Sequence, residues 1–453
     1  MNLEPAGQEK KTLFLTWCLS PYYNKKIVLL EEIVSTLPHG FFDGRLTKKH
    51  DCIASAYMKN FIFASLLATA LFTVTFAVNL QAPLYNVYAV GSSVGVTAVT
   101  LAFAAYVAGL MPTLMLLGGL SDRIGRRIPI AIALLFGLIA TFLLVIFPIW
   151  EMLVLARFML GMGTGFATTA GTAYMTEILG EAKAKQAALL VTSATSLGFG
   201  GGALATGISL NLQGGTIAPA SFIALFILAS TLSVFVLFLP RVDVPKRVSL
   251  LRLPVFPPHT WPYGIGLALA WSATGMTIAV VPLQLEAQGF AAYTGVIIFL
   301  SIFIGFLCQP IARRMEGRVA LLIGYALVPI GFLALVGGFW SQSILLILAG
   351  TCITSSASYG FTYLCGLSEF SLRASEDRAR ATAGLFVYAY MGFSLPVIAS
   401  GVLADMFGSL LALSLFLVFL FIVSFLVIAI WRFQARYEEV KSVQPEDSRC
   451  IDE

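Results

Sequence analysis

The stretch LLGGLSDRIGRRIPIA, residues 116–131, concentrates charge in a chain that carries little of it. Only 11% of the 453 residues are charged, and apolar sequence resumes at once on both sides of this stretch. Four charged side chains nevertheless fall within six residues here: Asp122, Arg123, Arg126 and Arg127. The pattern predicts a short charged turn between two segments that avoid water.

The composition of the whole chain excludes an ordinary soluble protein. The chain is 58% hydrophobic, with a mean hydropathy of +0.89, and its charged fraction is less than half of the roughly 25% usual in soluble domains. Segments of about 20 apolar residues can cross about 30 Å of hydrocarbon as helices. Twelve windows qualify, at roughly 61–82, 96–118, 128–148, 152–176, 187–210, 219–240, 263–285, 292–312, 319–340, 343–368, 381–404 and 409–431. We therefore predict an all-α polytopic membrane protein with twelve transmembrane helices.

Lysine and arginine are distributed unevenly over the links between these windows. The links after windows 2, 4, 6, 8 and 10 all carry them, whereas the links after windows 1, 3, 5, 7, 9 and 11 carry none. Positively charged short loops stay on the cytoplasmic side of a membrane. We therefore predict a protein of the cytoplasmic membrane with both termini and the turn at 118–127 in the cytoplasm.

The longest link inside the membrane region divides the windows into six and six. It reads PRVDVPKRVSLLRLPVFPPHTWP, residues 240–262, and is basic and rich in proline. We expect a cytoplasmic extension, a first six-helix bundle, a central cytoplasmic loop, a second six-helix bundle and a cytoplasmic tail, at residues 1–57, 58–240, 241–262, 263–433 and 434–453.

Short internal matches favour two similar halves. FAVNLQ, ending at Gln81, resembles IAVVPLQ, ending at Gln284. Three further pairs of positions are 194 residues apart: Gly198 and Gly392, Gly202 and Pro396, and Gly207 and Gly401. A repeat of this kind is typical of transporters built from two related bundles.

Residues 1–57 differ from the rest, because they are polar and basic with one mildly amphipathic piece, KKIVLLEEIVSTL. Met58 would itself make a natural start, since a charged residue and the first apolar window follow it. We interpret residues 1–57 either as a dispensable cytoplasmic extension or as the result of a misassigned start.

Seven positions of GGLSDRIGRR match G-x-L-x-D-R-x-G-R-R/K, the pattern of the loop between helices 2 and 3 in the major facilitator superfamily. They are Gly118, Leu120, Asp122, Arg123, Gly125, Arg126 and Arg127. Together with the twelve windows and the basic central loop, the chain from about 58 to 435 resembles this superfamily. The resemblance implies two pseudo-symmetric six-helix bundles and a transport function.

In the superfamily, this charged cluster latches the two halves together on the cytoplasmic side, and the resemblance implies the same role here. Gly118 allows close approach of two helices, and the Asp122 carboxylate can face the positive N-terminus of another helix. Arg126 and Arg127 can pair with a carboxylate, for which Glu177 is our choice. The alternative is that the charges of this cluster only set the orientation of the chain in the membrane.

Arg157 is the one Lys or Arg inside the twelve windows. An ionisable side chain at that depth costs at least about 2.5 kcal/mol unless it is paired or hydrated, so it is a functional candidate. The arginine followed by Gly161, Gly163 and Gly165 also resembles the helix-4 pattern of the superfamily, where it has been linked to substrate binding or proton coupling. There are two alternatives: the Arg157 side chain could extend to the outer membrane interface, or it could make a structural hydrogen bond to a carbonyl.

Other polar and aromatic side chains in the windows could line a central cavity. Amides in a span can equally bond to a neighbouring helix, and aromatic rings can serve as packing or interfacial anchors. The candidates are Asn79, Gln81, Tyr85, Trp271, Gln284, Tyr359 and Tyr388.

The resemblance implies proton coupling, but the residues themselves support it only weakly. The windows contain no histidine, and their carboxylates lie at the ends of the spans. Glu286 is closest to the outer mouth and could carry a proton only if its helix is broken there.

Glycines in spans 4, 5 and 11 are expected where helices pack closely: Gly161, Gly165, Gly198, Gly202, Gly207, Gly392 and Gly401. Span 5 departs from the G-x-x-x-G-P-x-x-G-G pattern of the drug–proton antiporters of the superfamily. Ala203 occupies the proline position and Thr206 replaces a glycine. The departure argues against multidrug efflux without excluding export.

We predict a secondary active transporter of a small organic solute that works by alternating access, coupled to protons and exporting its substrate. Uptake or facilitated passage of a small organic anion is the alternative. We expect a monomer in the bilayer with no cofactor, no metal and no nucleic-acid partner, since an ion gradient would supply the energy. A membrane-embedded enzyme or receptor is more remote, because intramembrane catalysis needs acid–base side chains that converge at one depth.

Overall fold

A computed structural model describes residues 44–241, 251, 253–374 and 377–443 of the chain, with side chains from residue 58 to residue 434 within those ranges. The chain divides into two units, Met1–Asn60 and Phe61–Glu453. The described part of the first unit is the beginning of one helix. The amphipathic piece at 25–37 lies outside the described residues.

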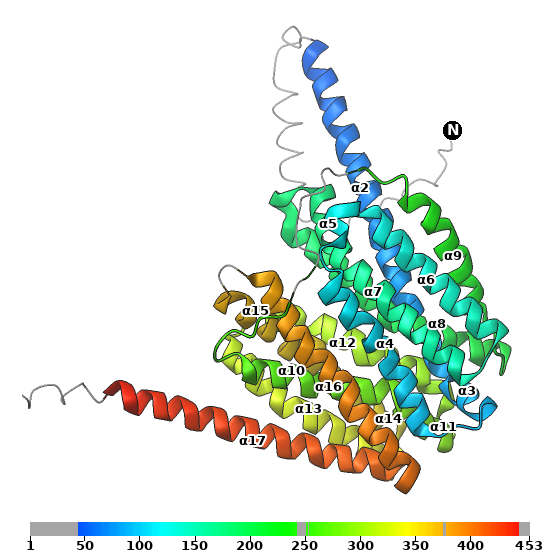
Figure 1. Cartoon of the computed structure of the whole chain (residues 1–453), viewed down its shortest axis with the longest axis vertical. Coiled ribbons are helices and arrows are strands. Elements are labelled where there is room, and N and C mark those ends of the chain that lie inside the picture. Colours follow the sequence, from blue (N-terminus) through cyan, green and yellow to red (C-terminus); the bar gives the residue numbers. More distant parts are fainter. Residues whose placement is uncertain (1–43, 242–250, 252, 375–376, 444–453) are drawn as a thin grey trace, which may run out of the picture. The chain divides into compact units, whose positions relative to one another are not determined.

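The described residues of the second unit form helices joined by short links (Figure 1). Those before the central loop are α2 (Gly44–Asn79, which starts in the first unit), η1 (Ala82–Leu84), α3 (Tyr85–Gly91), α4 (Val96–Leu116), α5 (Leu120–Ile124), α6 (Arg127–Ile146), α7 (Trp150–Leu179), η2 (Glu181–Lys183), α8 (Ala184–Gln213) and α9 (Ala220–Val236).

The helices after the central loop repeat much of this order. They are α10 (Trp261–Ala279), α11 (Val281–Ala287), η3 (Ala291–Tyr293), α12 (Thr294–Ala312), α13 (Gly317–Trp340), α14 (Ile344–Ser355), η4 (Ser356–Thr362), α15 (Tyr363–Arg373), α16 (Arg378–Phe407) and α17 (Ser409–Val443).

Among the described residues, twelve apolar helical segments follow the twelve predicted windows in order, so the fold prediction is confirmed. Eleven of them are long and apolar enough to cross a membrane, while the sixth, α9, has 17 residues. The outermost helices exceed their windows, because α2 begins at Gly44 and α17 ends at Val443. Neither extension contains a proline, so nothing in the covalent chain ends the helix at the window edge.

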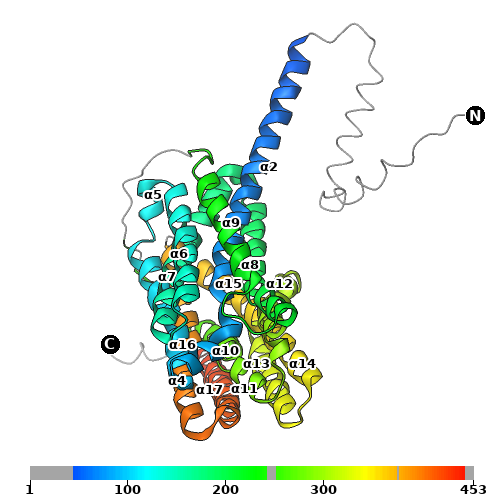
Figure 2. The same cartoon turned by 90° about the vertical axis from the view of Figure 1, so that its right-hand side faces the viewer.

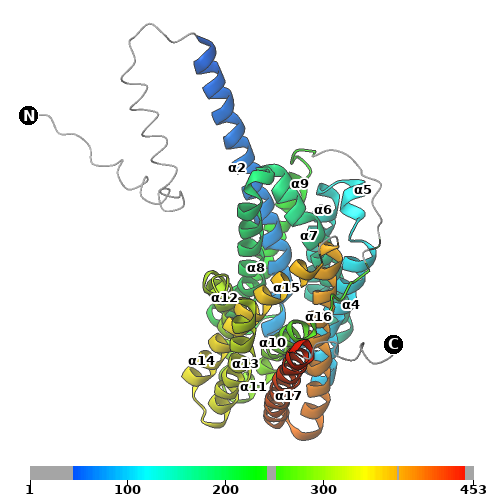
Figure 3. The ribbon, with the colours of Figure 1, turned by 90° about the vertical axis from the view of Figure 1, so that its left-hand side faces the viewer.

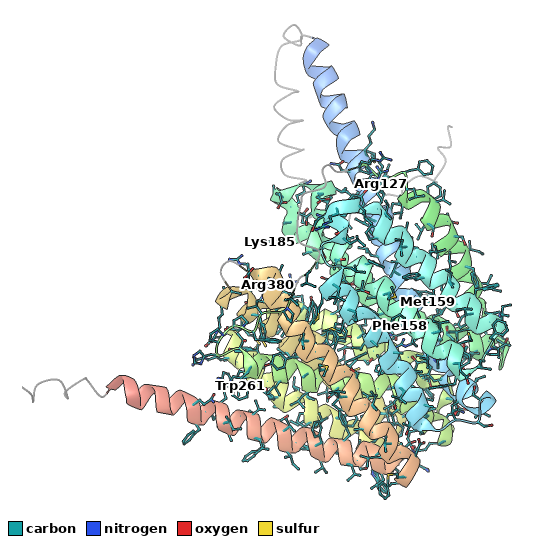
Figure 4. All side chains as sticks on the ribbon, viewed as in Figure 1. Arg127, Phe158, Met159, Lys185, Trp261 and Arg380 are labelled. Atoms are coloured by element: carbon teal, nitrogen blue, oxygen red, sulfur yellow. The ribbon has the colours of Figure 1, made fainter. Side chains whose placement is uncertain are left out.

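The two halves contact each other most extensively through two pairs of helices. α4 lies beside α16, and α8 lies beside α12; both pairs can be followed in Figures 2 and 3. We call the helix ends next to residues 117–126 the motif face and the other ends the opposite face. Arg127, Lys185, Trp261 and Arg380 mark the motif face in Figure 4.

The glycines 194 residues apart occupy equivalent places in the two halves. A Cβ atom at Gly198 would meet the Phe72 carbonyl of α2, the first helix of its half, and one at Gly392 would meet Ala268 of α10, the first helix of the other half. Gly401 lies against Thr100 of α4.

The partner of Gly401 in the repeat, Gly207, lies against Gly295 of α12. In both halves, therefore, the equivalent helix uses one glycine to pack against its own half and a later one to approach the other half.

The first helix of each half is broken at the same place. α2 ends at Asn79 and the chain resumes as η1 and α3, and α10 ends at Ala279 before α11. Pro83 and Pro282 lie in the first turn after each break, where a missing N–H group prevents the continuation of the hydrogen-bond ladder. The short match between residues 76–81 and 278–284 therefore marks two helix breaks.

Candidate substrate site and gates

The charged turn at the motif face is organised around one arginine. The Arg126 guanidinium pairs with Asp122 at 2.5 Å and with Glu177 of α7 at 2.9 Å, and it also donates to the Ser121 hydroxyl at 2.7 Å. Gly125 ends α5 with φ +89°, in the left-handed region that favours glycine. The structure thus brings Arg126 and the chosen partner Glu177 together.

Electrostatics favour the charged form of the Arg126 guanidinium. Burial acts to lower the pKa of the Arg126 guanidinium, but its hydrogen bonds and charge pairs with Glu177 and Asp122 outweigh burial and hold that pKa above its ordinary value. Arg127 does not share Glu177: its Nη1 atom donates to the Leu237 carbonyl after α9 at 2.8 Å. Both arginines therefore tie helices of the first half to one another.

The remaining members of the pattern have simpler places. Gly118 is buried in the link before α5, Leu120 is the first residue of α5, and the Arg123 side chain is exposed. These positions shape the turn that presents Asp122 and Arg126.

At the opposite face, one carboxylate joins the two halves. Asp405, near the end of α16, accepts hydrogen bonds from the Val96 N–H at 2.6 Å and the Thr97 N–H at 2.9 Å, and the Thr97 hydroxyl also donates to it. Those N–H groups begin α4, and the N-terminus of a helix favours a negative charge. A Cβ atom at Gly95 would clash with the same carboxylate.

A second link at this face connects the other pair of helices. The Asn211 side chain at the end of α8 donates to the Ala292 carbonyl, just before α12, at 3.1 Å. With the Asp405 contacts, it links the two halves at the opposite face. Sequence reasoning assigned Asp405 no role, because it is one of several carboxylates at the ends of the spans.

Arg157 of α7 is buried and engaged in the first half. Its Nη1 atom donates to the Val78 carbonyl at 2.6 Å, and the Gln81 amide donates to the same oxygen at 3.0 Å. The guanidinium lies 5.2 Å from the Phe103 ring centroid and 5.0 Å from that of Tyr106, within the range of a cation–π contact.

The second half contains an aromatic cluster, which is centred midway along α10. Its centre is Trp271 of α10, which is 7% exposed. Five rings surround it with centroid distances of 5.2–6.4 Å: Tyr359, Tyr363, Phe386, Tyr390 and Phe393. We call these six residues the Trp271 cluster.

The Trp271 cluster continues into the first half. Phe393 contacts Phe103 with centroids 4.7 Å apart, and Phe103 is one of the rings beside Arg157. Aromatic contacts therefore run without a gap from Arg157 to Trp271.

Two features make this cluster suitable for a ligand. The Trp271 Nε1–H group is buried and has no hydrogen-bond partner among the described residues, which is uncommon for a buried donor. The rings of Tyr359, Tyr363 and Tyr390 remain partly exposed around it. A flat solute could stack on these rings and accept a hydrogen bond from the indole.

The position of Tyr359 depends on an unusual helix. η4 (Ser356–Thr362) is a π-helix within the tenth span, between α14 and α15. The Thr362 hydroxyl donates to the Ala357 carbonyl, and the hydroxyls of Thr274 and Ser358 join η4 to α10 at 2.9 Å. π-Helical turns are frequent at functional sites, and this one places Tyr359 next to Trp271.

The other cavity candidates are not gathered there. Asn79 donates to the Phe199 carbonyl of α8 at 2.9 Å, so it joins two helices. Tyr85 and Gln284 are buried just beyond the two helix breaks. Tyr388 packs against Phe256 and Phe370 instead of Trp271.

Glu286 is exposed in α11, beyond the break in the seventh span. It lines a cavity of about 620 Å³ at the opposite face together with residues of both halves.

The packing glycines lie between helices as expected. Gly161 and Gly165 lie where α7 meets α4, and Gly202 lies against α2. Within the described ranges, no group of three His, Cys, Asp or Glu side chains could hold a metal ion.

Sequence reasoning left Tyr106, Phe103, Phe386 and Phe393 out of the candidate site. Each lies in an apolar span where aromatic residues are common, so type and spacing carried no signal. Their roles become visible when the contacts between α4, α10 and α16 are known.

The model of the family described as Major Facilitator Superfamily matches residues 67–387, more than half of the chain. The chain belongs to the major facilitator superfamily. A comparison with curated protein sequences gives no match.

Solved structures of members of this superfamily share the fold. A mutant of the nucleoside transporter NupG superposes with a TM-score of 0.67 at 14% identity, covering 81% of this chain and 99% of that one. A bacterial homolog of the human lysosomal transporter Spinster, in an inward-facing and occupied conformation, gives 0.61 at 14% identity, covering 81% and 96%. Unmutated NupG gives 0.63 at 12% identity, covering 82% and 98%.

Proposed function

We propose that this membrane transporter carries a small organic solute with a flat, unsaturated part, which the Trp271 cluster holds between the two halves. The observation that carries the proposal is the buried indole N–H of Trp271, surrounded by partly exposed tyrosines. Stacking and one directed hydrogen bond suit an aromatic or heterocyclic solute better than a small inorganic ion.

The proposed mechanism is alternating access. The contacts of Asp405 and Asn211 join the two halves at the opposite face, while the ion pairs of Arg126 with Asp122 and Glu177 stay within the first half. We assign the structure to a state open toward the motif face, and from the loop charges we infer that this face lies in the cytoplasm. A second state would release the opposite face and bring the motif turn against the other half.

Secondary active transport with protons as the coupling ion and export as the direction complete the proposal. An aromatic wall with one buried cation favours amphipathic compounds. From the sequence, we expect the transporter to export such organic solutes. The described acidic residues lie at helix ends rather than in mid-span. Catalysis has no place in this proposal.

Purified protein in proteoliposomes that hold a pH-sensitive dye provides the test. The panel includes nucleosides, whose flat base fits the cluster and which NupG is named for, an amphipathic aromatic amine and a small organic anion without a ring. Trp271→Leu should reduce transport of the aromatic compounds by about 10-fold, the size expected from loss of stacking.

Trp340→Leu is the matched control, because Trp340 is 66% exposed and lies away from the Trp271 cluster. Its transport rate should equal that of the wild type. Equal losses in both variants, or unchanged transport in Trp271→Leu, would contradict the proposed site.

Uptake of a small organic anion is the second candidate, and the buried Arg157 cation is the observation in its favour. Its guanidinium is already bonded to Val78 and flanked by two rings. Transport of the anion alone in the same panel would support this candidate over the first.

A further inference from the structure

A second cavity, of about 340 Å³, lies at the motif face of the second half, away from the Trp271 cluster. It is formed where α10 and α13 begin and where α15 and the membrane part of α17 end. Trp261 and Trp431 form aromatic walls, and Arg318, Arg373 and Arg432 provide positive charge. Figure 4 labels Trp261 at this place.

The charge of this cavity is only partly compensated. Arg373 pairs with Glu369 at 3.2 Å. Across the residues whose side chains the structure describes, neither Arg318 nor Arg432 has a carboxylate within ion-pair distance. Two exposed guanidinium groups from different helices therefore face one small cavity without an acidic partner.

The walls of the cavity are held in place. The Tyr325 hydroxyl of α13 donates to the Pro262 carbonyl at 2.6 Å, and Arg373 Nη1 donates to the Pro258 carbonyl at 3.4 Å. Trp431 packs edge-on against Tyr263 with centroids 6.0 Å apart. The start of α10 is thereby fixed to α13, α15 and α17, so the arginines converge on a defined space.

The surroundings point to the membrane rather than to bulk water. Tryptophan is enriched at the level of lipid headgroups, and two of them line this cavity. The adjoining surface of α17 exposes large apolar side chains, including Phe425 at 73% and Phe433 at 73%. An anionic group bound by the arginines could thus carry acyl chains that lie along α17.

We propose that this cavity binds the phosphate-bearing headgroup of an anionic phospholipid in the leaflet at the motif face. Basic pockets between transmembrane helices bind such headgroups, and the planar guanidinium groups match phosphate oxygens in pairs. Free phosphate shares this chemistry but has no use for the apolar surface of α17, so the lipid is the occupant that the structure favours.

Native mass spectrometry of the full-length protein tests the proposal, with phosphatidylglycerol and phosphatidylcholine supplied in equal amounts in detergent. The wild type should retain phosphatidylglycerol at least about fivefold more than phosphatidylcholine, and the double variant Arg318→Gln/Arg432→Gln should lose this preference. Arg313→Gln/Arg314→Gln should keep it, because those exposed arginines lie at the same face outside the cavity.

A measurement on a conservative variant guards against misfolding. Phosphatidylglycerol with brominated acyl chains should quench tryptophan fluorescence more than brominated phosphatidylcholine does, and Trp431→Phe should remove about half or more of that difference. Equal retention of both lipids, an unchanged preference in Arg318→Gln/Arg432→Gln, or displacement of phosphatidylglycerol by excess inorganic phosphate would overturn the proposal.

Discussion

Arg157 shows how a buried cation can serve a helix end. α2 ends at Asn79, so the Val78 carbonyl does not have the backbone N–H donor that a continuous helix would supply. Arg157 and Gln81 both donate to it. Because the C-terminal carbonyls of a helix carry partial negative charge, a cation there stabilises the broken end and so fixes the geometry at which the chain turns into η1.

The first prediction follows from this position. Arg157→Gln should lower the free energy of unfolding by about 1–3 kcal/mol, the cost of an unsatisfied buried group, and should slow transport of neutral and anionic solutes by the same factor. Thermal unfolding in detergent and flux of two labelled solutes measure both effects. Selective loss of the anion would show instead that Arg157 binds the substrate directly.

Arg126 provides a second prediction at the residue scale. Its pairs with Asp122 and Glu177 are half-buried, so Arg126→Gln should lower the free energy of unfolding by about 1 kcal/mol after allowance for solvent screening. Arg313→Gln, at the corresponding link after α12, should change it by less than about 0.5 kcal/mol because that side chain is exposed. Similar unfolding midpoints for the two variants would contradict a structural role for Arg126.

At the scale of elements, α4 and α16 form a contact at the opposite face, which opens in the transport cycle that we propose. The Asp405 carboxylate of α16 caps the first turn of α4, and Gly401 lets the two helices approach one turn earlier. The contact is polar and local, which suits a closure that must open during transport.

Asp405→Asn should weaken this closure. Loss of the charge at the α4 N-terminus costs about 1 kcal/mol, which shifts the population toward the state open at the opposite face by about fivefold. Spin labels at Ser93 and Met406, both exposed on different halves, report the shift as an increased fraction of long distances.

Glu151→Gln serves as the control for Asp405→Asn. Glu151 lies in the first turn of α7 and is exposed, so the variant removes one acidic charge from the same face without touching the contact. A distance distribution that responds equally to both variants would mean that net charge, and not the cap of α4, holds this face closed.

At the scale of the whole molecule, the fold could be predicted because it rests on local physics. A segment's length and hydropathy decide whether it can span a membrane, and the residues 76–84 and 278–284 carry the prolines that break two helices. The motif turn was equally readable, since Asp122 and Arg126 are close in sequence.

The candidate site could be predicted only in part. Trp271 and Tyr359 were both candidates, but Tyr388 packs elsewhere, because helices that are apolar on every side give no signal of which face turns inward. The π-helix at η4 and the contact of Asp405 with Val96 depend on packing between distant segments. Neither leaves a pattern in the sequence near the residues concerned.

The measurement that tests alternating access most directly is a pair of distances in the same membrane-reconstituted protein, with and without a transported solute. Spin labels at Lys185 and Arg314 report the motif face, where both positions are exposed at the ends of α8 and α12, and labels at Ser93 and Met406 report the opposite face. Alternating access predicts that one distance shortens as the other lengthens. Two distances that change together, or that never change, would contradict it.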